Sequence, residues 1–292
     1  MLGRSGRLRI AAVLVCASAT ASGETVGTLT VVEGPLQLVR GATTYSAAPG
    51  VALHTGDMLA TDPKGQVQIE FEDGAILNLA RGTRALLLGP QGGDAGVALL
   101  SGWAKFTRTK AAKGRPFRYV MPLARLSTAG ATGTLRVGVD SSEVFVESGT
   151  GRLDELSRNG SSGSGRDVKA GEFAVRTAAQ ALAVLPRPSA EFVKAMPGYF
   201  RDDLPAFLPR ARNKNLEPTR EHEATYAEVE PWLKASPPIR RPQVERFRGR
   251  AKDPQFRGKL IENLAAHPEW DRVLFPEKYE AGAEKSEKSE TK

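Results

Sequence analysis

The chain has 292 residues and a mass of 31.3 kDa, with 40% hydrophobic and 25% charged residues, which is globular composition and excludes a wholly disordered chain. One cysteine and three histidines exclude cysteine-rich zinc and iron–sulfur sites. No run approaches the roughly 18 consecutive apolar residues of a transmembrane helix, which excludes a multi-pass membrane protein. Thirty glycines and nineteen prolines favour turns and strands.

Residues 1–21 have the three parts of a secretory signal peptide: arginines without acids, a short apolar run, and small residues that end in A-x-A patterns. Cleavage fits after Ala19 or after Ala21, and we favour Ala21, which leaves Ser22 as the mature N-terminus. We therefore expect a periplasmic protein exported by a cleavable signal peptide. Lipidation of Cys16 is a minor alternative, because the bulky Val15 precedes it.

The net charge gives no sign of a nucleic-acid partner. Loss of the three arginines of residues 1–21 lowers the formal charge from +8 to +5. Acidic and basic side chains are nearly balanced along the rest of the chain, so the high isoelectric point reflects a mild surplus of positive charge. The mature chain also has no cysteine and no transmembrane span, and its oligomeric state is not determined by these patterns.

Strand patterns fill the chain from Val26 to about Val184. Val67–Phe71 alternates apolar and polar residues, and Asp73-Gly74 after it favours a two-residue type I′ hairpin. A second hairpin is expected between segments 136–140 and 143–147, and the set ends with strands 173–175 and 182–184. Parallel α/β folds are disfavoured because no helical crossovers intervene.

A weak internal repeat accompanies these strands. An apolar run, a glycine and further alternating residues recur around Gly34, Gly102 and Gly149. Many short strands with glycines at the bends are typical of an all-β sandwich, barrel or solenoid.

Four segments in the same order resemble the FecR domain, over roughly residues 26–180. They are a G-D-x-L-x-T turn at 56–61, a D-G hairpin within 71–79, an L-x-G strand start at 100–104 and the segment 122–134. Ala75 and the pair Leu135-Arg136 depart from the family pattern. The resemblance implies a periplasmic, mainly-β module used in signalling or envelope interaction, with no catalytic residues.

Helical signals begin near Phe192. Thr225-Tyr226-Ala227-Glu228 is a capping box, Asp253-Pro254 is an N-cap followed by proline, and a short helix is expected within 267–275. The domain organisation predicted is a signal peptide (1–21), a FecR-like β domain (22–190), a helical C-terminal region (191–280) and a disordered tail (281–292). The fold class is mainly β, an all-β sandwich or solenoid-like domain, with a small α-helical appendage.

No catalytic or metal pattern stands out. The histidines lie in different segments, and Glu221-His222-Glu223 is interpreted as a solvated run at a helix entry. Glu70 and Glu72 share one strand face, where paired carboxylates could perform acid–base chemistry. Their simpler interpretation is the wet face of an amphipathic strand. We expect no enzyme activity, no metal and no cofactor.

One basic strip stands out as a possible contact for anionic ligands. Over residues 105–118 it has six cations and no acid, and Phe106 and Phe117 could add a stacking surface. Such a strip could hold an anionic polymer by charge, and a solvated loop is the alternative. The six candidate contacts are Lys105, Arg108, Lys110, Lys113, Arg115 and Arg118.

The sequence therefore predicts a non-enzymatic periplasmic binding module whose partner is an envelope glycan or a protein. The first alternative is a component of a cell-surface signalling or regulatory system. Within it, a transmembrane anti-sigma regulator would need a cytoplasmic domain and a span before the β module, and only nine residues precede the apolar segment here. The second alternative is a polysaccharide-processing enzyme, for which no convergent acid–base set is present.

Overall fold

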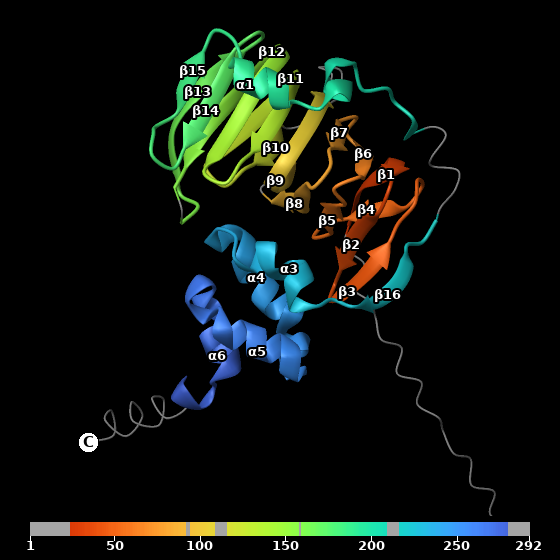
Figure 1. Ribbon diagram of the computed structural model, residues 1–292, viewed down its shortest axis with the longest axis vertical. Helices are drawn as coiled ribbons and strands as arrows, with labels where there is room; N and C mark the ends of the chain where they lie inside the picture. Colours follow the sequence, from red (N-terminus) through yellow and green to blue (C-terminus); the bar gives the residue numbers. More distant parts are fainter. Residues whose placement is uncertain (1–23, 92–93, 109–115, 158, 209–215, 280–292) are drawn as a thin grey trace, which may run out of the picture.

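The computed structural model describes residues 24–91, 94–108, 116–157, 159–208 and 216–279 (Figure 1). The predicted signal peptide and the predicted disordered tail lie outside these residues. The strands are β1 (Thr25–Glu33), β2 (Leu36–Arg40), β3 (Thr43–Ser46), β4 (Ala52–His54), β5 (Met58–Thr61), β6 (Gln66–Phe71), β7 (Ile76–Leu79), β8 (Arg84–Gln91), β9 (Asp94–Arg108), β10 (Phe117–Val120), β11 (Ala124–Val137), β12 (Ser141–Leu156), β13 (Ser162–Lys169), β14 (Phe173–Thr177), β15 (Ala183–Leu185) and β16 (Thr219–Glu223).

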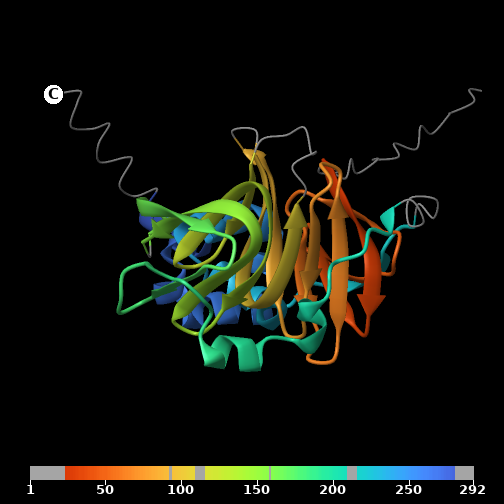
Figure 2. The ribbon, with the colours of Figure 1, turned by 90° about the horizontal axis from the view of Figure 1, so that it is seen from above.

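All sixteen strands belong to one sheet, whose main path runs β15-β14-β12-β11-β10-β9-β8-β5-β2-β3-β16. Neighbours are mostly antiparallel, and β9 and β10 pair in parallel. The sheet curls around one hydrophobic core, to which strands far apart in the chain contribute, such as Leu29 of β1, Leu126 of β11 and Val168 of β13 (Figure 2). The predicted mainly-β fold with C-terminal helices is thus confirmed.

The turn between β6 and β7 differs from the predicted two-residue hairpin. Phe71 N–H donates to the Ala75 carbonyl at 2.8 Å, so three residues form the connection. Gly74 takes the left-handed conformation, with φ of 83°. Three-residue hairpin loops commonly place a glycine there, because this conformation strains residues that have a Cβ.

The repeated glycines lie at bends. Gly102 in β9 and Gly149 in β12 have φ of 94° and 79°. A Cβ on Gly102 would lie 2.4 Å from Thr83 Oγ1, and one on Gly149 would lie 2.3 Å from the Gly130 carbonyl oxygen. Both positions therefore require glycine for backbone conformation and for close packing.

Helices dominate after β15. They are α1 (Ala190–Ala195), η1 (Gly198–Arg201), α3 (Tyr226–Leu233), α4 (Pro237–Phe247), η3 (Arg248–Lys252), α5 (Pro254–Glu262), η4 (Leu264–Ala266), η5 (Pro268–Trp270) and α6 (Asp271–Leu274). The predicted capping box starts α3, and Asp253 caps α5 through the Phe256 amide. None of the helices in the described part of the chain is long and apolar enough to cross a membrane.

The outer surface of the curled sheet has two differently covered regions. The first is apolar, and it includes Val39, Met58, Leu86 and Ala98. These side chains form a second core with residues of α3, α4 and α5, chiefly aromatic rings such as Trp232. The C-terminal helices therefore pack on the sheet as a second layer (Figure 1).

The second outer region is polar and lies under residues 189–208, which we call the strap. The strap contains α1 and η1 and then continues without regular secondary structure to Phe207. Phe192 of α1 packs against Trp103 of β9 and Phe173 of β14, with 4.9 Å between ring centroids in each pair. The strap thus crosses the sheet from β14 over β9 to β6 before the chain reaches β16.

Strand β16 ties the helical region to the β domain. It pairs antiparallel with β3, with Arg220 opposite Tyr45 and His222 opposite Thr44. Residues 221–223, interpreted from sequence as a helix entry, are therefore part of an exposed edge strand. The boundary near residue 190 coincides with the change from strands to helices, and whether the parts fold independently stays a prediction.

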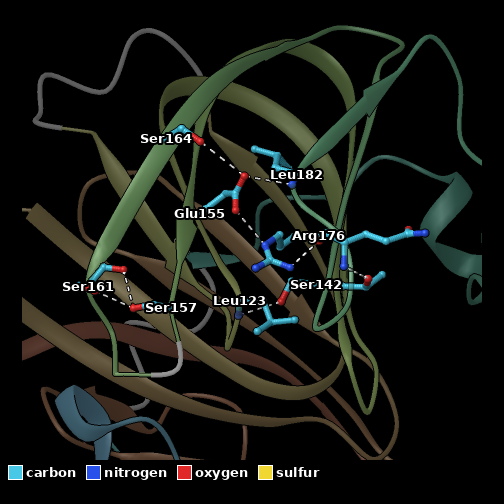
Figure 3. A network of polar contacts seen from close by, with 10 residues as sticks. Leu123, Ser142, Glu155, Ser157, Ser161, Ser164, Arg176 and Leu182 are labelled. Atoms are coloured by element: carbon cyan, nitrogen blue, oxygen red, sulfur yellow. Dashed lines mark hydrogen bonds and ion pairs between the residues drawn. The ribbon is translucent and has the colours of Figure 1, made fainter.

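A polar network holds the opposite edge of the sheet (Figure 3). Glu155 of β12 receives the Arg176 Nε at 3.0 Å and the Leu182 amide at 3.0 Å. Ser164 of β13 lies 3.5 Å from the same carboxylate. This single side chain therefore connects β12 with β13, with β14 and with the residue that precedes β15.

Candidate functional site

Lys105, the first residue of the predicted basic strip, is fully buried under the strap. Its ammonium group pairs with Glu147 Oε2 at 2.9 Å and donates to the Phe200 carbonyl at 2.6 Å. The charge is thus compensated inside the protein. The expectation of an exposed contact at Lys105 is wrong for this structure, because β9 turns this side chain toward a face that the strap covers.

Arg108 is also buried, at 3% exposure. Its Nη1 lies 2.5 Å from Asp73 Oδ2, and its guanidinium lies 5.7 Å from the centre of the Phe117 ring. Phe106 and Phe117 belong to the main core and pack against Tyr119. They offer no stacking surface, so this part of the predicted strip also needs correction.

The other four residues of the strip do not form a surface in the described chain. Arg118 is half-buried, interacts within the protein and lines one of the hollows described next. Lys110, Lys113 and Arg115 lie outside the described residues. The three described residues of the strip, Lys105, Arg108 and Arg118, thus all interact within the protein.

A groove lies between the sheet and the turn that joins α3 to α4. It consists of three adjoining hollows with cavity volumes of about 350, 300 and 300 Å³, and Ser236 of the turn lines all three. Concave sites at the junction of two layers are common places for ligands and partners. We call these hollows together the interlayer groove.

The floor of the interlayer groove is apolar. Leu86, Leu88 and Val120 line it from the sheet, and Ile239 lines it from α4. At one end Val139, in the turn between β11 and β12, is fully exposed and borders the second hollow. Val139 extends the apolar surface of the groove, and contiguous apolar surface with a polar rim marks interaction sites.

The rim of the interlayer groove is mainly basic. The Arg84 side chain is exposed, and its guanidinium forms no hydrogen bond or ion pair with a described residue. Three other cations of the rim are partly neutralised by ion pairs. The pairs are Arg125 with Asp154, Lys234 with Glu230, and Arg240 with Glu269. Asp140 is an acid of the second hollow. The cations of the rim are Arg84, Arg118, Arg125, Lys234 and Arg240.

Local sequence signals set the helical wall of the groove. Thr225 and Glu228 form the capping box that starts α3, and Pro237 at the first position starts α4 after a short turn. Burial would raise the pKa of Glu228, but hydrogen bonds from Thr225 and His222 outweigh it and lower this pKa. The carboxylate therefore stays ionised and capped.

Arg246 fixes α4 on the sheet. Its guanidinium donates to the carbonyls of Val39 at 2.8 Å, Gly41 at 2.6 Å and Gly56 at 2.5 Å. Burial lowers the pKa of Arg246 to about 10, and the carboxylate of Asp57 acts in the opposite direction. The group is still charged near neutral pH, so all its donors remain available to hold the groove wall in place.

The two carboxylates considered for acid–base chemistry are not paired in a cleft. Glu70 is 4% exposed and accepts the amides of Phe207 at 2.6 Å and Leu208 at 2.9 Å. The strap therefore covers Glu70, whereas Glu72, in the turn after β6, is exposed as expected for a solvated residue. Within the residues that the structure describes, no cluster of three or more histidine, cysteine, aspartate or glutamate side chains could hold a metal ion.

Sequence reasoning missed the interlayer groove. Its main residues come from segments separated by about 50 residues or more, such as Arg84, Val139 and Lys234. No local signal marked it, because Val139 alternates with Val137 and fits the strand predicted over 136–140, whereas β11 ends at Val137 and leaves Val139 in the turn.

Residues 57–150 match the FecR family, described as FecR protein. This segment is similar to the FecR domain. The match covers β5 to most of β12, and it includes the sheet wall of the interlayer groove but none of the helical wall. None of the curated proteins compared with the chain matches it.

Two solved structures align with 47% of this chain, at 18% and 16% identity and a TM-score of 0.39 each. Both are crystal structures of a "putative anti-sigma factor" from Parabacteroides distasonis ATCC 8503, at 1.65 and 2.50 Å resolution. The chain spans 63% and 62% of their lengths.

Proposed function

We propose that this protein is a non-enzymatic component of a cell-surface signalling or regulatory system, in which its FecR domain binds a protein partner in the periplasm. The match of residues 57–150 to the FecR family carries the proposal. The periplasmic location rests on the basic, apolar and A-x-A parts of residues 1–21.

The interlayer groove is the surface that we assign to the partner. Its apolar floor and basic rim suit a protein segment that combines apolar side chains with carboxylates. An anionic glycan is less well supported as the ligand, because Lys105 and Arg108 are neutralised by Glu147 and Asp73. A polysaccharide-processing enzyme is the least supported, since Glu70 already accepts two backbone amides.

The direct test is capture of proteins from envelope extract by the mature chain and by groove variants. Arg84→Glu reverses an exposed charge of the rim, and Val139→Asp removes the exposed apolar residue. Arg166→Glu is the matched control, because Arg166 is exposed on β13 and does not line the groove. We expect one partner to be captured by the wild type and the control and lost with either groove variant.

A signalling role also predicts that loss of the protein changes gene expression. A strain with Arg84→Glu should show the same change in transcripts as a strain that lacks the protein, while the Arg166→Glu strain should behave as the wild type. An unchanged transcript profile in the deletion strain would contradict signalling. Capture of the same proteins by all variants would contradict the groove as the binding surface.

A further inference from the structure

A row of polar side chains crosses the sheet beneath the strap. Strand register places Gln68 of β6 opposite Asn78 of β7, Asn78 opposite Lys105 of β9, and Lys105 opposite Thr134 of β11. All four side chains are less than a tenth exposed. They share the outer face of the sheet, because their neighbours along each strand point into the main core. We call this row, together with Glu70, the polar row.

The polar row binds the strap almost entirely through main-chain atoms. Lys105 donates to the Phe200 carbonyl at 2.6 Å, and Gln68 donates to the Pro205 carbonyl at 2.8 Å. Glu70 accepts the amides of Phe207 and Leu208. Side chains of the sheet thus recognise main-chain atoms of the strap, a form of recognition that does not depend on the sequence of the bound segment.

Aromatic anchors add to these polar contacts. Phe192 and Phe200 of the strap are fully buried, and Phe192 lies between Trp103 and Phe173. Backbone hydrogen bonds combined with a few buried aromatic side chains are the elements of peptide-binding sites. The covered face of the sheet has both.

The strap leaves one member of the polar row unsatisfied. Asn78 is 7% exposed, and its Oδ1 has no hydrogen-bond partner among the described residues. A buried acceptor without a donor costs free energy, which a segment with a donor at this position would recover. The strap is therefore not the best occupant that the face can have.

The buried charges also favour a face that can be uncovered. Lys105 is fully buried, with Glu147 as its ionic partner and Thr134 donating to Glu147 at 3.1 Å. A permanently covered face is often at least as stable with apolar residues in place of an ion pair. When the strap leaves, water can hydrate these charged groups, which lowers the free-energy cost of uncovering the face. Uncovering an apolar face would cost more, because it would expose apolar surface to water.

We propose that the polar row and its flanking aromatic residues form a peptide-binding face, occupied in cis by the strap and opened when a segment of a partner protein displaces it. The partner segment carries an aromatic anchor and a hydrogen-bond donor that reaches Asn78. This inference rests on the proposed function only for the existence of a protein partner. Exchange of the strap is a property of the purified chain and can be tested without that partner.

The test uses a fluorescently labelled peptide of residues 190–208 as the probe and the full mature chain as the receptor. In the wild type the strap competes at a high effective concentration, so binding of the peptide is weak. Weakening the strap with Phe192→Ala and Phe200→Ala should raise the affinity for the peptide by roughly tenfold or more. Adding Glu70→Gln to the strap-weakened chain should lower its affinity for the peptide again by about tenfold, because one charged acceptor is lost.

Val193→Ala is the matched control, since Val193 lies on α1 but is 39% exposed, and it should bind the peptide as the wild type does. Equal affinities for the wild type and the strap-weakened chain would overturn the proposal. So would a gain in affinity that Glu70→Gln leaves unchanged. Failure of this test leaves the FecR-domain partner and the interlayer groove untouched.

Hydrogen exchange of the unaltered chain provides a test that does not depend on folding of a variant. The amides of Phe207 and Leu208 should exchange much faster than those of Leu135 and Val144, which pair with each other in the β11–β12 ladder between β9 and β14. Addition of excess peptide should leave the ladder amides unchanged. Exchange of all four amides at one common rate would show that the strap leaves only on global unfolding, and would overturn the proposal.

Discussion

The Nη2 atom of Arg246 donates to the Val39 carbonyl oxygen at 2.8 Å, across 207 residues of sequence. The same guanidinium reaches the carbonyls of Gly41 and Gly56, so one side chain of α4 satisfies three main-chain acceptors of the sheet. An apolar contact could not replace the guanidinium, because the part-buried carbonyls of Val39 and Gly56 need donors. The position of the interlayer groove wall therefore depends on this residue.

Replacement of Arg246 should destabilise the docking of the helices on the sheet. We expect Arg246→Ala to lower the free energy of unfolding by about 2–4 kcal/mol, since three carbonyls lose their donor. Arg246→Lys should recover only part of the loss, because an ammonium group cannot span all three acceptors. Urea unfolding followed by tryptophan fluorescence measures this, with Arg248→Ala, an exposed neighbour, as control. A loss below about 0.5 kcal/mol would contradict the role given to Arg246.

Acid should destabilise the helical layer through His267. This side chain is 1% exposed and shares a 3.0 Å hydrogen bond with the Tyr226 hydroxyl. Burial lowers its pKa, and the positive charges of Lys234 and Arg240 lower it further. Below a pH of about 6.5 the unfolded chain binds a proton that the folded chain excludes, so stability falls toward the folded-state pKa by up to about 1.4 kcal/mol per pH unit.

His267→Gln should reduce this acid sensitivity. Melting temperatures at pH 7.5 and 5.5 are the measurement, and the variant should show a smaller difference between the two than the wild type. Burial also lowers the pKa of His54, so a part of the pH dependence should remain and disappear only in the double variant with His54→Gln. Equal pH dependence in the wild type and in His267→Gln would show that His267 is not the responsible group.

The basic strip should separate into structural and exposed residues. Lys105→Glu places a carboxylate beside Glu147 in a buried position and should cost about 3–5 kcal/mol of stability. Combined replacement of Lys110, Lys113 and Arg115 by glutamate should change the melting temperature little. If these three residues bind anionic glycan, sedimentation with purified sacculi should weaken with salt and be lost in the triple variant. Equal sedimentation of both proteins would exclude a binding role for them.

A truncated chain of residues 22–190 tests the predicted domain boundary. Its circular dichroism should show strands and little helix, because the described helices start at Ala190. Removal of the helices uncovers Val39, Met58 and Leu86, so the shorter chain should bind a hydrophobic dye more strongly than residues 22–280. Substantial helix in residues 22–190, or a chain that does not fold, would contradict the division.

Export predicts a mature N-terminus at Ser22. N-terminal sequencing of protein from a periplasmic fraction is the measurement, and a start at Ser22 is the expected result. A start at Thr20 would indicate cleavage after Ala19. Protein that keeps Met1 and stays in the cytosol would contradict export, and a lipid on Cys16 would show an anchored form instead.

Local patterns in the sequence determined most of the secondary structure. Alternation at 67–71 predicted β6, and the capping box at Thr225 and the N-cap at Asp253 predicted the starts of α3 and α5. The FecR motifs placed the domain that the family match covers. These signals are short-range, because strand alternation, caps and turn glycines involve residues only a few positions apart.

Only the tertiary structure decided which faces are covered and which residues meet. Glu70 and Lys105 have the pattern of solvent-exposed residues, yet the strap buries both with contacts 95 to 138 residues away. The interlayer groove forms where the turn after α3 packs on β8 and β10. A strand shows which side chains share a face, but only long-range packing determines whether water, a strap or a helix lies against that face.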